Sequence, residues 1–69
     1  MESKQVGKLG KKIRELRLKL GLSQDEFARK ADMAYTTLTK IETGVIKSPS
    51  VFMVAKIAKA LGVNINDLI

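Results

Sequence analysis

Residues 22–44, LSQDEFARKADMAYTTLTKIETG, contain the start signals of two short helices. In the first, Ser23 and Glu26 have the S-x-x-E spacing of a capping box, in which each side chain accepts a hydrogen bond from the other residue's backbone N–H. Leu22 and Phe27 occupy the two positions of a hydrophobic staple. The pattern predicts a helix of about two turns that begins at Gln24.

A second helix is predicted to begin at Tyr35, after the connection formed by residues 32–34. Met33 and Leu38 have staple spacing across this start, which makes Ala34 the N-cap. Alanine is a poor N-cap, since replacing Ser or Thr by Ala there typically costs ~0.5 to 2 kcal/mol. Packing must therefore hold this start more than capping does. Two short helices joined in this way form a helix-turn-helix, whose second helix can enter a DNA major groove.

The second helix is rich in threonine, although β-branched residues are mediocre helix formers. Helical periodicity predicts an inward side formed by Leu38, Ile41 and Glu42. It predicts an outward side formed by Thr36, Thr39, Lys40 and Thr43. Threonine hydroxyls and lysine can bond base edges, and threonine methyls can pack on thymine methyls. An ordinary solvated helix face is the alternative, and the residues alone leave both open.

The composition limits the classes of function. The 69 residues suit one domain, and neither Cys nor His occurs. This removes disulfides, thiol nucleophiles, imidazole bases and nearly all transition-metal sites, so we expect no metal, no cofactor and no enzymatic activity. The net charge of +6 indicates a polyanionic partner, for which nucleic acid, an acidic protein and anionic lipid are the candidates.

Nothing in the sequence indicates a membrane segment. No apolar run approaches the ~20 residues that span a bilayer, and the N-terminus lacks the apolar core of a signal peptide. We therefore expect a soluble, cytoplasmic protein. Residues 1–69 are expected to form a single domain in which residues 1–5 are a flexible N-terminal tail.

Three further helices are predicted outside the central pair. The first ends at Gly21, and its apolar stripe consists of Leu9, Ile13, Leu16 and Leu20. Another begins at Ser50, after a loop over residues 44–50, and ends at Gly62; its inward residues are Val51, Val54, Ile57, Ala58 and Leu61. The last is capped by Asn64. The predicted fold class is all-α, a compact five-helix bundle.

Several motifs stand in a defined order: Ile13-Arg14-Glu15-Leu16-Arg17, residues 21–28 (GLSQDEFA), Ile41-Glu42-Thr43-Gly44, Pro49-Ser50 and residues 57–63 (IAKALGV). With them the chain resembles the Cro/C1-type (XRE) helix-turn-helix family over roughly residues 7–69. The resemblance implies a DNA-binding bundle of the lambda-repressor-like type, with the second and third helices as the helix-turn-helix.

The resemblance also implies roles for the residues at matching positions. Base edges are expected to be read by Tyr35, Thr36, Thr39 and Lys40. Phosphates are expected to be contacted by Gln24, Thr37, Thr43 and Lys47. Arg17 and Glu42 match a pair that often forms a largely buried ion pair. Helical periodicity agrees, because Glu42 lies on the inward side of its helix and Arg17 at the edge of the first apolar stripe.

The chain departs from the family pattern at the start of the third helix. Ala34 stands where the family usually has Ser or Thr, so a hydroxyl that could cap the helix and touch phosphate is missing. Tyr35 could pack on a thymine methyl or bond a phosphate, or it could be an exposed tyrosine without a role in DNA binding.

Phe52 and Met53 lie off the apolar face of the fourth helix or at its edge, where the family more often has polar residues. Aromatic residues and methionine are enriched at protein interfaces. We predict that both help to form a homodimer, and an extension of the core is the alternative.

The expected function is sequence-specific binding of double-stranded DNA by a transcriptional regulator, a repressor that acts as a homodimer on a near-palindromic operator. A protein-interaction module on the same scaffold, without specific DNA binding, is the alternative. Membrane association through the cationic first helix is less favoured, because the core needs its apolar stripe. No small-molecule ligand is expected. The residues do not separate a phage repressor from a restriction-modification controller or an antitoxin.

Overall fold

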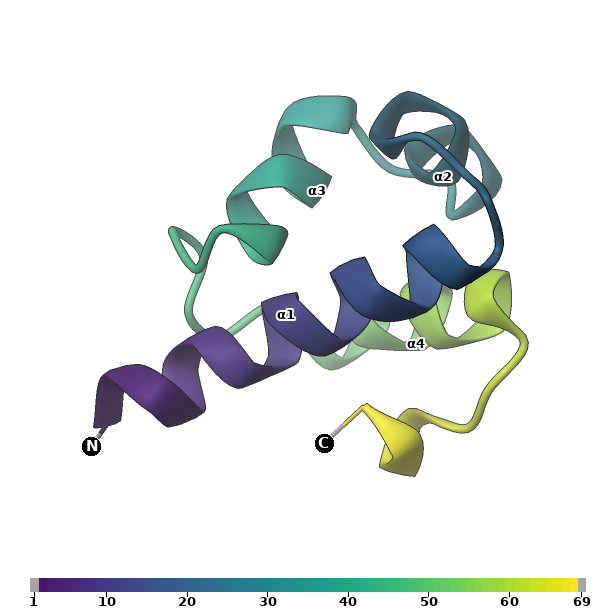
Figure 1. Cartoon of the computed structure of the whole chain (residues 1–69). Coiled ribbons are helices and arrows are strands. Elements are labelled where there is room, and N and C mark those ends of the chain that lie inside the picture. Colours follow the sequence, from purple (N-terminus) through teal and green to yellow (C-terminus); the bar gives the residue numbers. More distant parts are fainter. Residues whose placement is uncertain (1, 69) are drawn as a thin grey trace.

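The computed structural model describes the backbone of residues 2–68 and the side chains of residues 8–68. Its elements are α1 (Glu2–Lys19), α2 (Gln24–Lys30), α3 (Tyr35–Glu42), α4 (Val51–Leu61) and the 3-10 helix η1 (Ile65–Asp67) (Figure 1). Over these residues there is no strand, so the all-α class is confirmed. The count of five α-helices is not confirmed, because the last element is a 3-10 helix of 3 residues.

The helix α1 includes residues 2–5, which are expected from the sequence to belong to a tail. The flexibility of residues 1–5 stays a prediction.

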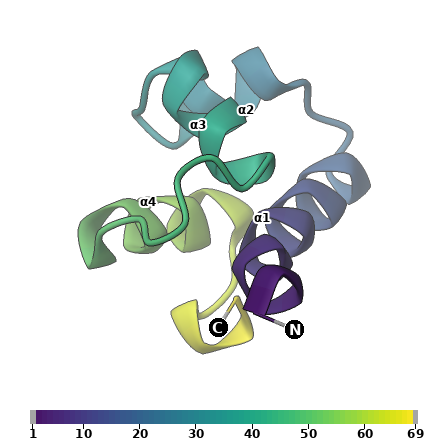
Figure 2. The same ribbon diagram turned by 90° about the vertical axis from the view of Figure 1, so that its left-hand side faces the viewer.

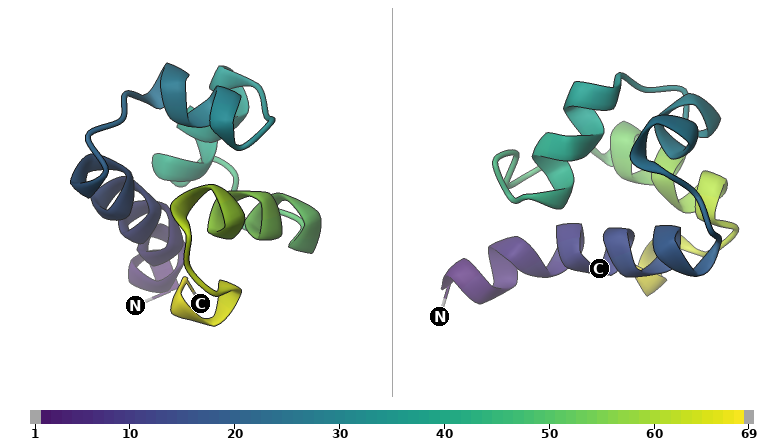
Figure 3. Two further views of the ribbon diagram at one scale, coloured as in Figure 1. Left: turned by 90° about the vertical axis from the view of Figure 1, so that its right-hand side faces the viewer. Right: turned by 45° about the horizontal axis from the view of Figure 1, so that its top comes forward.

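The elements lie in three tiers. α2 and α3 form the upper tier, α1 and α4 lie side by side below them, and η1 folds underneath (Figures 1 and 2). Contacts join α3 to both α1 and α2, and α4 to both α1 and η1. Further views show that α3 and the loop after it stand at one side of the molecule (Figure 3). α3 is therefore supported from beneath and from one flank only.

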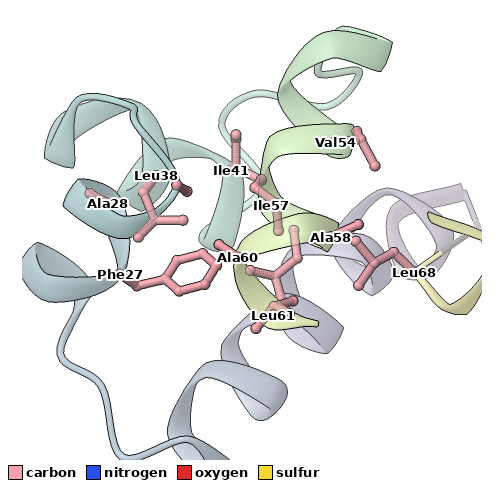
Figure 4. Packing of buried hydrophobic residues seen from close by; sticks show 12 residues of the cluster. Phe27, Ala28, Leu38, Ile41, Val54, Ile57, Ala58, Ala60, Leu61 and Leu68 are labelled. Atoms are coloured by element: carbon pink, nitrogen blue, oxygen red, sulfur yellow. The ribbon is translucent and has the colours of Figure 1, made fainter. Parts of the chain in front are cut away.

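The core lies where all four α-helices meet. Its largest fully buried side chains are Phe27, Ile13, Leu38, Ile41 and Ile57. Figure 4 shows Leu38 and Ile41 of α3 pointing toward Phe27 of α2 and Ile57 of α4. Two predicted core positions are wrong, since Leu20 is 48% exposed and Val51 is 73% exposed. Leu20 follows the last residue of α1 and Val51 is the first residue of α4, so both lie at helix ends, whereas the fully buried residues of these helices lie further inside them.

The turn between α2 and α3 closes through Asp32, which has a left-handed φ of 56°. The Met33 N–H donates to the Ala28 carbonyl at 2.9 Å and the Asp32 N–H donates to the Arg29 carbonyl at 3.1 Å, which is a Schellman motif. Glycine usually occupies this position, and aspartate is one of the few residues that tolerate it. Lys56 of α4 donates to the Asp32 carbonyl at 3.2 Å and ties the turn to the core.

Gly10 marks a close approach of α1 to α3. It is buried, and a Cβ placed there would lie 2.8 Å from the carbonyl oxygen of Glu42 and closer still to that of Ile41. Only glycine lets the two helix backbones approach this closely. No pattern in the sequence indicates this contact, which brings the end of α3 next to the side chain of Arg17.

Candidate nucleic-acid interface

α3 has the two sides that its sequence predicts. Leu38, Ile41 and Glu42 are buried, whereas Tyr35, Thr36, Lys40 and Thr43 are exposed. Thr37 and Thr39 are half-buried. Ala34 gives the helix no side-chain cap, so packing of the buried side holds the start of α3.

Two threonine hydroxyls of α3 are bonded within the helix. Thr39 Oγ1 donates to the Thr36 carbonyl at 2.8 Å, and Thr43 Oγ1 donates to the Thr39 carbonyl at 2.8 Å. Such bonds use the single proton of each hydroxyl and leave its lone pairs and the side-chain methyl for a partner. In this conformation, Thr39 and Thr43 can accept hydrogen bonds and pack on apolar groups, but they cannot donate to a base or a phosphate.

Arg17 and Glu42 form an ion pair between α1 and α3. Arg17 Nε donates to Glu42 Oε2 at 2.8 Å, and Arg17 Nη2 donates to Glu42 Oε1 at 3.2 Å. Arg17 Nη1 donates to the Leu22 carbonyl at 2.8 Å, which fixes the chain just before α2. The side chains of Arg17 and Glu42 are 7% and 1% exposed. The pair therefore sets the position of α3 relative to α1 and to the start of α2.

Gln24 connects this pair to the start of α3. Its Nε2 donates to Glu42 Oε1 at 3.0 Å, and its Oε1 accepts a long hydrogen bond of 3.5 Å from the Tyr35 hydroxyl. These partners fix the orientation of the amide. One Nε2 hydrogen of Gln24 is bound by Glu42, and the other remains for an external acceptor such as a phosphate oxygen.

The capping box holds Gln24 in place at the start of α2. Ser23 Oγ accepts from the Glu26 N–H at 3.1 Å, and Glu26 Oε1 accepts from the Ser23 N–H at 2.9 Å. The Ser23 backbone N–H is the main cause that lowers the pKa of the Glu26 carboxyl below its ordinary value. The lowered pKa keeps Glu26 ionised, and the cap intact, to a lower pH than an unshifted glutamate would allow.

An open cleft of about 370 Å³ lies beside the ion pair. It is lined by Arg14, Arg17, Gln24, Glu42 and Thr43. Two predicted phosphate contacts, Gln24 and Thr43, thus share one hollow. Arg14 is not among the site residues expected from the sequence, and its place in this hollow depends on how α1 packs on α3.

The remaining predicted site residues lie outside the cleft. Lys47 is exposed in the loop after α3, whose position is fixed by the Ile46 N–H that donates to the Lys40 carbonyl at 3.0 Å. Phe52 is 82% exposed, whereas Met53 is half-buried and packs against the core. Phe52 and Met53 therefore differ in how much of each side chain a second copy could reach.

Within residues 2–68 no helix is both long enough and apolar enough to cross a membrane. The described part of the chain also holds no group of three or more carboxylate, His or Cys side chains placed to bind a metal ion.

Known proteins resemble this chain over most of its length. The helix-turn-helix family matches residues 13–68. Control protein C.BamHI of Bacillus amyloliquefaciens is 39% identical over 61 residues, which cover 87% of this chain and 74% of that protein. An uncharacterized HTH-type transcriptional regulator of Archaeoglobus fulgidus is 37% identical over 57 residues, which cover 83% of this chain and 80% of that protein.

A solved structure agrees with these sequence matches. The crystal structure of the restriction-modification controller protein C.AhdI from Aeromonas hydrophila matches with a TM-score of 0.87 and 30% identity, covering 97% of this chain and 98% of that chain. The names of these relatives describe regulators and controllers rather than enzymes. The family expected from the sequence is thereby confirmed: the chain belongs to the XRE-type helix-turn-helix family of DNA-binding regulatory proteins.

Proposed function

We propose that this protein is a sequence-specific regulator of transcription that places α3 in the major groove of double-stranded DNA. The observation that carries the proposal is the division of α3 into a buried apolar side and a compact, exposed polar side. The net charge of +6 suits a polyanionic partner. The fixed Gln24 amide at the edge of α3 supplies a donor where a DNA backbone would pass.

In this proposal the residues expected to contact DNA divide into base contacts and phosphate contacts. Lys40 donates to guanine O6 or N7, and the methyls of Thr36 and Thr39 pack on thymine methyls. Tyr35, at the start of α3, packs its ring on a thymine methyl or bonds a phosphate with its hydroxyl. The phosphate contacts are Gln24, Thr37, Thr43 and Lys47, and Thr43 must give up its bond to the Thr39 carbonyl before it can donate.

The relatives also suggest which genes are regulated. C.BamHI is named a control protein and C.AhdI a restriction-modification controller. We extend that role to this chain and propose that its operators lie before the genes of a restriction-modification system, where occupancy represses transcription. A DNA partner implies a cytoplasmic location.

Selection from a pool of random duplexes tests the proposal. We expect the parent to enrich a near-palindromic sequence and to bind it with a steep dependence on salt. Lys40→Ala is expected to relax the preference at one base pair per half-site, with a loss of about 1 to 3 kcal/mol of discrimination. The matched control is Lys59→Ala, which removes an exposed lysine from α4 and should keep the preference.

The alternative function, a protein-interaction module, is favoured by the exposed apolar residues Val51 and Phe52. Two results together would support it. The selection would enrich no duplex, and the protein's weak, salt-sensitive affinity for DNA would change equally in Lys40→Ala and Lys59→Ala.

We further propose that the protein acts as a homodimer through the start of α4, because Phe52 is 82% exposed there. Phe52→Ala is expected to shift sedimentation at micromolar concentration from dimer toward monomer and to weaken operator binding. Leu18→Ala, which truncates a 56% exposed leucine on α1, is the control and should leave the dimer intact. A parent that sediments as a strict monomer at high micromolar concentration would contradict the homodimer.

A further inference from the structure

The cleft beside the ion pair has one uncompensated positive charge. Of the charged residues that line it, Arg17 and Glu42 are buried and neutralise each other. The third, Arg14, is exposed, and no carboxylate within the described part of the chain forms an ion pair with it. The charge available to a ligand in this cleft is therefore that of the Arg14 guanidinium.

The donors that face the cleft come from two helices. The Gln24 amide has one hydrogen left after its bond of 3.0 Å to Glu42. The guanidinium of Arg14 has five N–H donors in a planar fork, a geometry that matches two oxygens of one phosphate. Thr43 adds no donor in this conformation, because its hydroxyl proton is bound to the Thr39 carbonyl, and it can donate to a phosphate only after that bond is released. The site thus offers one cation and one neutral donor to an anionic, oxygen-rich group.

We propose that this cleft holds a single phosphate of the DNA backbone, with Arg14 as its cationic contact and Gln24 as its neutral donor. The inference rests on the proposed function. If α3 lies in the major groove, the DNA backbone at its border passes over the first residue of α2 and the residue after α3, and these two residues line the cleft. Arg14 therefore extends the DNA contact from the helix-turn-helix to α1.

The test compares Arg14→Gln with Lys12→Gln. Lys12 is an exposed cation of α1 that points about 200° away around the helix, so both variants lose the same charge from the same helix. Each is titrated over a salt series with the duplex enriched by the parent and with an unrelated duplex. We expect Arg14→Gln to weaken binding to both duplexes about fivefold to tenfold and to lower the salt slope by about 0.9 per subunit. Lys12→Gln should change affinity by less than about twofold.

The Arg14→Lys variant shows whether Arg14 acts by contacting a phosphate or only by stabilising the fold. It keeps the charge but loses the planar fork, so we expect a parent-like salt slope and an affinity between those of the parent and Arg14→Gln. Thermal melting of each variant shows whether it is folded at the assay temperature. If Arg14→Lys bound as weakly as Arg14→Gln and melted lower than the parent, the contact would be structural and the inference wrong.

Two other outcomes distinguish the inference from the function on which it rests. Equal salt slopes for Arg14→Gln and Lys12→Gln, with the parent still selecting its duplex, would overturn the phosphate site and leave the proposed function standing. A parent that selects no duplex would overturn both.

Discussion

Glu42→Ala is expected to lower the free energy of unfolding by about 3 to 5 kcal/mol, because it leaves the buried charge of Arg17 without its carboxylate. Arg17 would keep only its bond to the Leu22 carbonyl, and Gln24 would lose the acceptor that orients it. At about 0.05 to 0.15 kcal/mol per residue, a domain of this size has a total stability of about 3 to 10 kcal/mol. A large fraction of the Glu42→Ala variant should therefore be unfolded at 37 °C.

Urea denaturation followed by circular dichroism measures this loss. Arg29→Ala is the control, since it breaks the exposed pair of Arg29 with Asp25 on α2, where the loss should be at most about 1 kcal/mol. Glu42→Gln keeps the shape and one acceptor oxygen, so its stability should fall between those of the parent and Glu42→Ala. A Glu42→Ala variant with the parent's denaturation midpoint would show that the pair does not hold α1 to α3.

Gly10→Ala is expected to destabilise the protein by about 1 to 3 kcal/mol, although the substitution favours the helix itself by about 1 kcal/mol. The added Cβ would lie 2.8 Å from the Glu42 carbonyl oxygen and nearer to that of Ile41. These are backbone atoms of α3, which cannot rotate away as the end of a side chain can. α1 and α3 must separate, and the geometry of the Arg17–Glu42 pair must change with them.

Gly21→Ala is the comparison for this variant in thermal melts. Gly21 has a left-handed φ of 73°, and a Cβ there would meet no atom within 4 Å, so only backbone strain of about 1 kcal/mol is expected. Gly10→Ala should melt below Gly21→Ala. If Gly10→Ala instead raised the melting temperature, helix propensity would outweigh the clash and the close approach of α1 to α3 would be wrong.

The sequence predicted the features that depend on neighbouring residues. The start of α2 at Gln24 followed from its capping box, and the start of α3 at Tyr35 followed from the staple spacing despite the poor cap. The inward side of α3 followed from the helical period of its apolar residues. Local rules suffice here because each feature lies within about two helical turns.

Several features that depend on packing between helices could not be predicted from local patterns. The contact of Gly10 with α3 and the place of Arg14 in the cleft arise only when α1 is docked. Leu20 matched the apolar stripe, but it follows the last residue of α1 and is 48% exposed. Asp32 gave no sign of its left-handed conformation because the usual signal for it is glycine.

The roles of threonine in α3 were only partly visible in the sequence. The period placed Thr36, Thr39 and Thr43 on the outward side. It did not show that the hydroxyls of Thr39 and Thr43 donate to carbonyls of their own helix. These bonds leave a surface of methyls and acceptor oxygens, which narrows the base contacts that α3 can make.

The most direct test of α3 as the DNA-reading helix is an NMR titration of the isotope-labelled protein with its selected duplex. We expect the largest amide shifts along residues 35–43, with further shifts at Gln24 and in the loop that contains Lys47, and small shifts near Lys59 on α4. Large shifts confined to the surface around Val51 and Phe52, with α3 unchanged, would contradict a base-reading α3 and would show that the duplex contacts another surface.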